Sequence, residues 1–231
     1  MGRSLVIVES PAKAKTINRY LGDDFEVLAS YGHVRDLPSR DGAVDTENGY
    51  AMHYELSDGS KKHVDKIIKA TRKADAVYLA TDLDREGEAI SWHIYEILKE
   101  KKLTRNTPFY RVEFSEITKR AILEAVANPR ELSMDLVNAQ QARRALDHLV
   151  GFTLSPLLWK KIKPGLSAGR VQSPALRMIV EREREIEAFN AREYWTIEAQ
   201  LQQSGHAFTA NLVFLDGDKY RQFDIQDEKR A

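Results

Sequence analysis

The chain has 231 residues, of which 42% are hydrophobic and 30% are charged, so it can bury one large or two modest cores. It has no cysteine, which excludes disulfides and thiolate metal sites and is typical of a reducing cytoplasm. The N-terminal apolar stretch is too short for a signal peptide, and no run approaches the roughly 18 apolar residues of a membrane span. We therefore expect a soluble, cytoplasmic protein without a membrane segment.

The charges cancel overall but are distributed unevenly. There are 35 basic and 35 acidic side chains, which alone argues against a simple basic nucleic-acid-binding module. Residues 141–184 nevertheless carry nine Lys or Arg against three acids. These are Arg143, Arg144, Lys160, Lys161, Lys163, Arg170, Arg177, Arg182 and Arg184 against Asp147, Glu181 and Glu183. A basic region beside an acidic site is what metal-assisted chemistry on a phosphodiester needs.

Apolar runs alternate with amphipathic segments over residues 1–130, and the two patterns predict strands and helices respectively. Strands are expected at 4–8, 25–31, 76–80 and 109–114, and helices at 12–21, 61–74, 84–99 and 118–127. A polar stretch, 39–60, is expected to be a surface excursion. The alternation predicts an α/β domain with a parallel sheet, whose functional groups gather beyond the carboxyl ends of the strands.

The pattern changes twice after this domain. Helices are expected at 134–150, 155–162 and 168–189. Beyond Asn190, alternating stretches at 194–199 and 208–214 predict the first strands of an all-β region. We therefore expect three parts, bounded as 1–130, 131–190 and 191–231.

Four carboxylates follow the predicted strands. Glu9 ends the first strand, and Asp82, Asp84 and Glu86 stand where a later buried run leads into a helix. In an extended segment Asp82 and Asp84 point the same way, and such a cluster of hard oxygen atoms suits Mg²⁺. Alternatively, Asp84 caps the helix and Glu86 is favoured by the helix dipole. Because this alternative leaves Asp82 and Glu9 unexplained, we favour a metal site.

These carboxylates resemble the acidic motif of the Toprim domain, which type IA and type II topoisomerases, bacterial primases and some nucleases share. Longer segments resemble the bacterial DNA topoisomerase I family, which is type IA, in the family's order. They are 5–17 (LVIVESPAKAKTI), 32–38 (GHVRDLP), 80–90 (ATDLDREGEAI), 138–144 (NAQQARR) and 166–174 (LSAGRVQSP). The resemblance runs from residue 3 to about residue 195.

The resemblance implies a Toprim domain with a Rossmann-like parallel sheet, then a mainly helical domain and the start of a β gate domain. It implies an enzyme that relaxes negatively supercoiled DNA through transient, Mg²⁺-dependent breakage and rejoining of one strand. Glu9 would handle the proton of the leaving 3′ oxygen, and Asp82, Asp84 and Glu86, together with Glu9, would hold Mg²⁺. Lys13 would stabilise the phosphate. His33 and Arg111 are further candidates for hydrogen bonds to phosphate or within the active site.

The helical part resembles the region that grips the single strand. By this resemblance, a pocket that reads one base would be lined by Arg144, Asp147, Ser167, Arg170 and Gln172. Arg143 would be a phosphate contact or a plain surface charge. Phe152 and Trp159 lie at helical spacing among leucines, so we expect them in the core rather than stacked on bases. His148 and Phe152 stand where many relatives have Arg and Tyr, which predicts a weaker base preference.

The nucleophile of the family is missing from this sequence. It is a tyrosine that precedes Arg-Thr by one residue, and none of the nine tyrosines has that context. We therefore expect this chain alone to be inactive in relaxation, although it would bind the single-stranded segment of supercoiled duplex DNA as a nucleoid-associated monomer. Two alternatives are a Toprim nuclease or primase, which should lack the 138–144 and 166–174 segments, and a naturally truncated, non-catalytic DNA-binding module.

Overall fold

The computed structural model describes residues 3–231. Within this range the chain forms two compact units, one that ends at Gln172 and one that covers Ser173–Ala231. The first unit therefore combines the predicted α/β segment with most of the predicted helical segment. No helix among the described residues is both long enough and apolar enough to cross a membrane.

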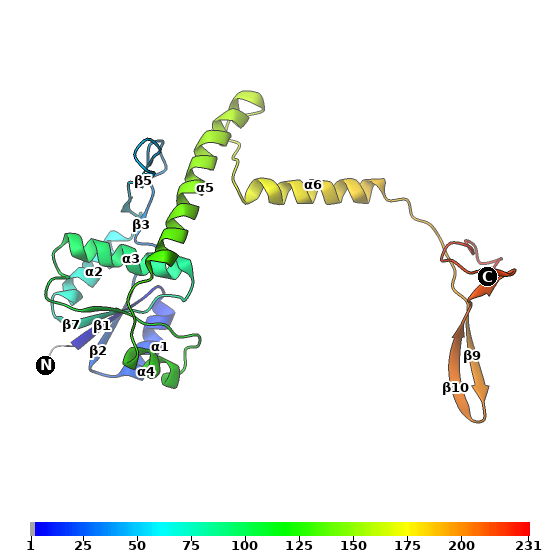
Figure 1. The fold of residues 1–231 in the computed structure, drawn as a ribbon, viewed down its shortest axis with the longest axis horizontal. Coiled ribbons are helices and arrows are strands. Elements are labelled where there is room, and N and C mark those ends of the chain that lie inside the picture. The colour runs from blue at the N-terminus through cyan, green and yellow to red at the C-terminus, as the bar shows by residue number, and fades with distance from the viewer. Residues whose placement is uncertain (1–2) are drawn as a thin grey trace. The chain divides into compact units, whose positions relative to one another are not determined.

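A parallel four-stranded sheet organises the first unit, as the alternating pattern predicted (Figure 1). Its strands are β1 (Arg3–Val8), β2 (Phe25–Ala29), β7 (Ala74–Leu79) and β8 (Phe109–Arg111), in the order β2-β1-β7-β8. Since β1 and β7 are neighbours, their carboxyl ends meet at one edge, where Ile7 pairs with Leu79. The sheet therefore brings Glu9 close to the segment that follows β7.

Four helices cover the two faces of the sheet. They are α1 (Pro11–Leu21), α2 (Lys61–Thr71), α3 (Arg85–Glu100) and α4 (Lys119–Ala127). Because side chains alternate along a strand, Leu5 and Ile7 pack against α2 and α3, while Val6 and Val8 pack against α1 and α4. Burial on both faces explains why β1 is continuously apolar from Leu5 to Val8 rather than alternating.

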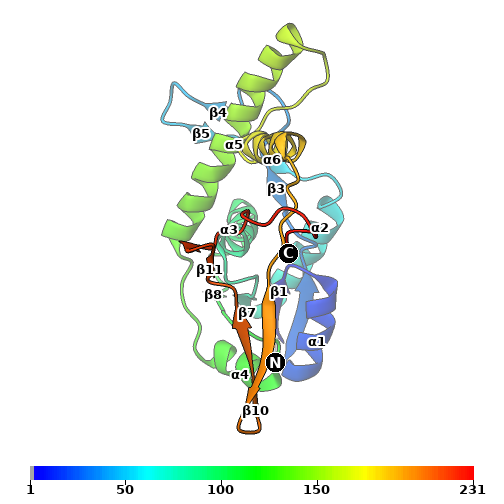
Figure 2. The same cartoon turned by 90° about the vertical axis from the view of Figure 1, so that its right-hand side faces the viewer.

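The stretch 39–60 is more ordered than a polar surface excursion. It contains β4 (Val44–Asp45), β5 (Ala51–Met52) and β6 (Glu55–Leu56), and β3 (Arg35–Asp36) precedes it. These strands pair as β3–β6 and β4–β5. Ala43 and Val44 are buried in a cluster with Leu37 and Ala145, beside the long helix α5 (Figure 2). The residue pattern did not indicate these strand pairs or the buried cluster, because only short apolar pairs interrupt a polar segment.

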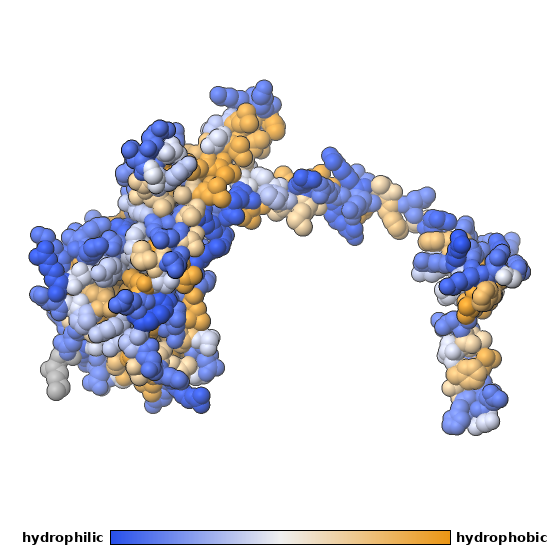
Figure 3. All heavy atoms as spheres, viewed as in Figure 1, coloured by the Kyte–Doolittle hydropathy of each residue, from blue (hydrophilic) through white to orange (hydrophobic). Residues whose placement is uncertain are grey.

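The helix α5 (Met134–Lys161) is continuous, so the break expected between 150 and 155 was wrong. Pro156 removes one backbone hydrogen bond, but the other turns of this 28-residue helix keep their hydrogen bonds and the helix continues through the proline. Hydrophobic side chains are exposed along the second half of α5, among them Leu154 and Leu157 (Figure 3).

The second unit contains the expected β region. Its elements follow α6 (Gln172–Ala188) and are β9 (Glu198–Gln203), β10 (His206–Asn211), β11 (Phe214–Leu215) and β12 (Asp218–Lys219). The strands β9 and β10 form an antiparallel hairpin that turns at Ser204 and Gly205, both with positive φ (52° and 82°). The all-β start of this region is thus confirmed, although its first strand begins later than residue 194.

A buried ion network joins the sheet to α3 and α5. Glu88, fully buried on α3, accepts hydrogen bonds from Arg111 Nε (2.9 Å), from both terminal nitrogens of Arg130 (2.9 and 2.7 Å) and from the Ser133 amide (2.6 Å). Burial alone raises the pKa of Glu88, but these bonds outweigh it and lower the pKa to about 2. Ser133 caps α5, so Glu88 fixes where that helix starts.

Glu88→Gln should lower the free energy of unfolding by about 3–5 kcal/mol at neutral pH, because it leaves the buried Arg111 charge without its counterion. The folded-state pKa lies below the ordinary 4.5, so the carboxylate stabilises the fold above pH 4.5 and loses this effect as the pH falls toward about 2.

Urea unfolding of wild type and variant over that pH range measures both effects. Glu96→Gln is the matched control, since Glu96 lies on the same helix in a surface pair with Lys99 (3.0 Å). An E88Q variant that is as stable as E96Q would contradict the assignment.

Candidate active site

The acid loop, residues 80–87, connects β7 to α3 and is held by short polar contacts. The Thr81 hydroxyl lies 2.5 Å from the carbonyl of Gly87 and 2.8 Å from the Ser91 hydroxyl. An added Cβ on Gly87 would lie 2.2 Å from the Asp82 carbonyl oxygen. The loop therefore closes on itself so tightly that only glycine fits at position 87.

Glu9 and Asp82 lie together at the carboxyl ends of β1 and β7, as the sequence predicted. The Asp82 amide donates to Glu9 Oε2 (2.9 Å), and Lys13 Nζ forms ion pairs with both carboxylates. Lys13 reaches them from the first turn of α1, which Ser10 caps. Burial opposes the charge of Lys13, but its hydrogen bonds to Asp82 and Glu9 outweigh burial and raise the pKa of its ammonium group.

Asp84 and Glu86 point to other partners. Asp84 caps α3, where its Oδ1 accepts from the Gly87 amide (2.8 Å). Glu86 Oε2 accepts from Gln140 Nε2 of α5 (3.1 Å) and lies 4.0 Å from His33 Nε2. The structure therefore brings Glu9 and Asp82 together but does not gather all four carboxylates, because the helix cap and the contact with α5 hold the other two.

The donor set is compatible in kind with Mg²⁺. Within residues 3–231 no three His, Asp or Glu side chains converge closely enough to form a ready-made cation site. Carboxylate oxygens are nevertheless the ligands that Mg²⁺ prefers, and it needs few of them because it keeps several waters. The Lys13 ammonium lies between Glu9 and Asp82, where the two carboxylates attract a cation. Asp82 and Glu86 are both partly exposed, so their side chains can turn toward an ion.

Arg111 lies beneath the acid loop rather than in it. Its side chain is fully buried and donates to Glu88 and to the carbonyls of Leu79 (3.0 Å), Thr81 (2.9 Å), Asp82 (2.6 Å) and Val112 (2.6 Å). The expected contact between Arg111 and a phosphate does not fit this position, because no face of the guanidinium reaches solvent. Arg111 instead holds the backbone from which Asp82 projects.

The residues expected to read a base gather where α5 meets the loop before α6. Arg144 makes a bidentate pair with Asp36 (2.6 and 2.8 Å), and Arg170 Nε donates to Asp147 (2.7 Å). The bond from Arg170 lowers the pKa of Asp147, which keeps that carboxyl group ionised. The remaining contacts are Gln172 Nε2 to Ser167 Oγ (2.8 Å), the Ala168 amide to Ser155 Oγ (3.1 Å) and Arg143 Nε to Asp147 Oδ2 (3.7 Å).

A cavity of about 330 Å³ opens in this region, bordered by Arg144, Asp147 and Ser167. Phe152 and Trp159 also border it and are 38% and 46% exposed, so the expectation that they belong to the core was wrong. His148 stacks on Phe152, with ring centroids 4.3 Å apart, and burial lowers its pKa. The imidazole is therefore neutral where many relatives were expected to carry a charged arginine.

Four residues of this site were not singled out from the sequence. Asp36 and Gln140 stand inside recognised segments, GHVRDLP and NAQQARR, but nothing in the residue pattern indicated their partners Arg144 and Glu86. Glu88 looked like one more acid of a first helical turn, and Arg130 lay in a linker. Their roles depend on contacts between segments distant in sequence, which periodicity does not report.

Comparisons with known proteins find relatives for both parts of the chain. The Toprim domain profile matches residues 4–117, and the DNA topoisomerase profile matches residues 131–231. DNA topoisomerase 1 of Xylella fastidiosa (strain 9a5c) is 64% identical over 231 residues, which are 100% of this chain and 28% of that protein. DNA topoisomerase 1 of Rickettsia typhi is 60% identical over 229 residues, 98% of this chain and 29% of that protein.

The chain belongs to the bacterial DNA topoisomerase I family. The solved full-length topoisomerase I from Thermotoga maritima aligns with a TM-score of 0.77 and 42% identity, covering 94% of this chain and 36% of that one. The chain thus spans about a third or less of the length of these relatives.

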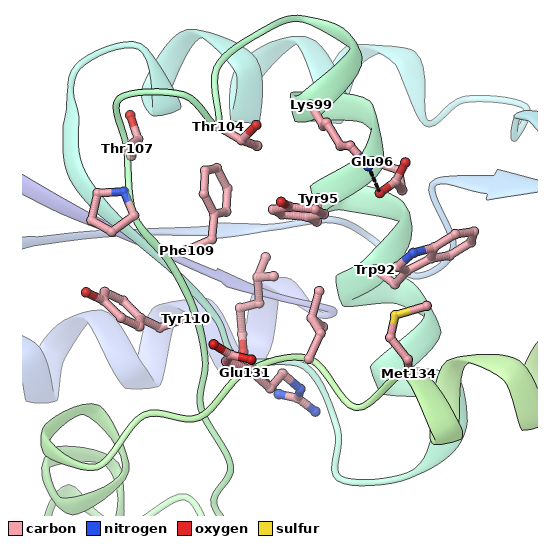
Figure 4. A pocket seen from close by; sticks show the side chains of 14 residues that line it. Trp92, Tyr95, Glu96, Lys99, Thr104, Thr107, Phe109, Tyr110, Glu131 and Met134 are labelled. Carbon is pink, nitrogen blue, oxygen red and sulfur yellow. Dashed lines mark hydrogen bonds and ion pairs between the residues drawn. The ribbon is translucent and has the colours of Figure 1, made fainter.

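A further cavity of the chain, about 600 Å³, lies between α3 and β8 (Figure 4). Aromatic side chains of Trp92, Tyr95 and Phe109 border it, and Glu96 pairs with Lys99 at its rim. Arg111 is the one predicted site residue on its border, and there it faces the acid loop through its hydrogen bonds. This cavity is therefore separate from the acidic site.

Gly87→Ala should destabilise the chain by about 1–3 kcal/mol, because the new methyl group forces the backbone of Asp82 to move. Gly151→Ala is the matched control. Gly151 lies inside α5, and an added Cβ would lie 3.8 Å from the Ala168 carbonyl oxygen, an ordinary van der Waals distance. The G151A variant is therefore expected to be more stable by about 0.5–1 kcal/mol. Urea unfolding of both variants measures the change in the free energy of unfolding. A G87A variant as stable as wild type would disprove the close approach of Gly87 to the Asp82 backbone.

Proposed function

We propose that the chain supplies the acidic, metal-dependent half of a type IA topoisomerase active site and part of its single-strand groove. The whole protein would then relax negatively supercoiled DNA by breaking and rejoining one strand. The observation that carries this proposal is the convergence of Glu9, Asp82 and Lys13 at the ends of two adjacent strands. Two carboxylates and an ammonium group in contact can manage both a proton and the charge of a phosphodiester.

Each of these side chains has a distinct part in the proposal. Glu9 holds the proton that the leaving 3′ oxygen takes up, and Lys13 turns from the carboxylates to the phosphate. Asp82, Asp84 and Glu86 would hold Mg²⁺, which supplies positive charge against the phosphate oxygens during rejoining. His33, half-exposed and 4.0 Å from Glu86, is placed for a hydrogen bond to the same phosphate.

The strand would run from the acid loop along α5 into the base pocket. Arg144, Asp147, Ser167, Arg170 and Gln172 supply donors and acceptors for one base, and Arg143, 40% exposed, is open to a phosphate. This pocket disfavours a Toprim nuclease or primase, because the 138–144 and 166–174 segments build it. The proposed substrate places the protein on the nucleoid in the cytoplasm, and we propose that it acts as a monomer.

Arg144→Met should weaken binding of a short single-stranded oligonucleotide by about tenfold, because it removes a charged donor from the base pocket (roughly 1–3 kcal/mol). Arg177→Met is the matched control, since Arg177 forms a solvated pair with Glu181 on α6 (2.7 Å). Fluorescence anisotropy titrations over a series of salt concentrations measure both variants. Equal losses in the two would contradict the assigned pocket.

The 231-residue chain alone should not relax supercoiled plasmid DNA at any Mg²⁺ concentration, because carboxylates and a cation cannot replace the attacking tyrosine. Gel electrophoresis of the plasmid after incubation provides the measurement, with a full-length family member as the positive control. Relaxation by a contaminant-free sample would refute this expectation.

A further inference from the structure

Gln140 connects the acid loop to the helix that carries the base pocket. It lies on α5, is 6% exposed, and donates from Nε2 to Glu86 Oε2 (3.1 Å). Its Oε1 is also buried, yet no hydrogen-bond partner for it exists among residues 3–231. Buried amide oxygens nearly always have a donor, so this acceptor requires an explanation.

The orientation of this amide is determined by Glu86. A carboxylate only accepts hydrogen bonds, so the NH₂ group of Gln140 must face it and the oxygen must face elsewhere. Rotating the amide by half a turn would place two oxygens in contact. The free acceptor is therefore a consequence of the contact with Glu86.

The amide borders a polar cavity of about 340 Å³. The cavity walls include His33 and Glu86 from the acid site and Arg143, Arg144 and Asp147 from the strand-binding part of α5. A ligand that spans these two sites would therefore pass Gln140. The wall carries three arginines and three acids, and Arg143 and Arg144 among them suit a phosphodiester. The unpaired Oε1 suits an N–H donor such as the amino group of a base.

We propose that Gln140 is a positioning residue through which single-strand binding in this cavity and divalent-cation binding at Glu86 reinforce each other. This inference rests on the proposed function. A base amino group on Oε1 fixes the amide, and the fixed Nε2 then holds the Glu86 carboxylate in one orientation. Because coupling between two ligands is reciprocal, Glu86 held by a cation must favour the strand by the same factor.

The other link between these elements does not have this property. Glu88 also joins α3 to α5, through the Ser133 amide, but its carboxylate is fully buried and all its neighbours are protein groups. It therefore holds the two elements in place whether or not a ligand is present. Gln140 differs because its Oε1 has no hydrogen-bond partner among residues 3–231.

Binding of Mn²⁺, followed by electron paramagnetic resonance with and without a saturating short oligodeoxycytidylate, tests the proposal on the 231-residue chain. In wild type the oligonucleotide should raise the Mn²⁺ affinity about fivefold or more. Gln140→Met keeps the side-chain volume but removes both polar ends, so this ratio should fall to about one. Gln141→Met is the matched control, because the Gln141 amide contacts Asn138 (3.4 Å) rather than the acid loop.

The outcomes separate this inference from the function on which it rests. If wild type binds neither Mn²⁺ nor the oligonucleotide, the proposed function fails. If wild type binds both but independently, or if Q140M retains the wild-type ratio, Gln140 has no coupling role. A loss of coupling in Q141M as well would also overturn the proposal.

A second measurement follows the Gln140 side chain of the wild-type protein directly. The side-chain NH₂ signal of Gln140, assigned by its absence in Q140M, should shift in ¹⁵N–¹H spectra of wild type. We expect it to move on addition of the oligonucleotide without metal, and again on addition of Mg²⁺ without oligonucleotide. A signal that responds to neither ligand would overturn the proposal, because a purely structural amide has no reason to sense them.

Discussion

The buried guanidinium of Arg111 is the interaction on which the acidic site depends. The chain leaves β7 at Leu79 and turns into the acid loop, where Arg111 donates to the carbonyls of Leu79, Thr81 and Asp82 at once. A single planar group with five donors can do this, whereas a lysine cannot. Glu88 neutralises the charge of Arg111. The buried guanidinium therefore holds the backbone of the acid loop without itself being exposed at the surface. Asp82 thus projects from a rigid backbone.

Charge at the site itself is balanced by a different cation. Glu9 and Asp82 would repel each other at the ends of β1 and β7, and Lys13 lies between them. This arrangement explains how the fold tolerates two adjacent carboxylates, since a lysine on the helix α1 supplies a positive charge between them. It also makes the pair adaptable, because a flexible ammonium group can leave when a phosphate or a stronger cation arrives.

The sequence predicted most of the sheet and the meeting of Glu9 with Asp82, because strand periodicity and the carboxyl-edge rule depend only on local pattern. It offered the capping role of Asp84 only as the less favoured alternative, and it did not predict the partner of Glu86. Asp84 satisfies the first turn of α3, which local capping preferences allow but do not require. Glu86 turns to Gln140, 54 residues along the chain, and no spacing rule encodes such a contact. Continuity of α5 through Pro156 likewise depends on packing that the residue pattern does not contain.

In the proposed function, the acid loop and the base pocket form one site because α5 joins them. Its first residue follows Ser133, which Glu88 holds, and its next turns carry Gln140 against Glu86 and Arg144 against Asp36. A helix is stiff along its axis, so a strand bound at Arg144 would be held at a fixed distance from the carboxylates. In the proposed function, the base pocket would therefore set the position at which the phosphodiester meets Glu9, and a helix with little buried surface in its second half would still determine where the chemistry occurs.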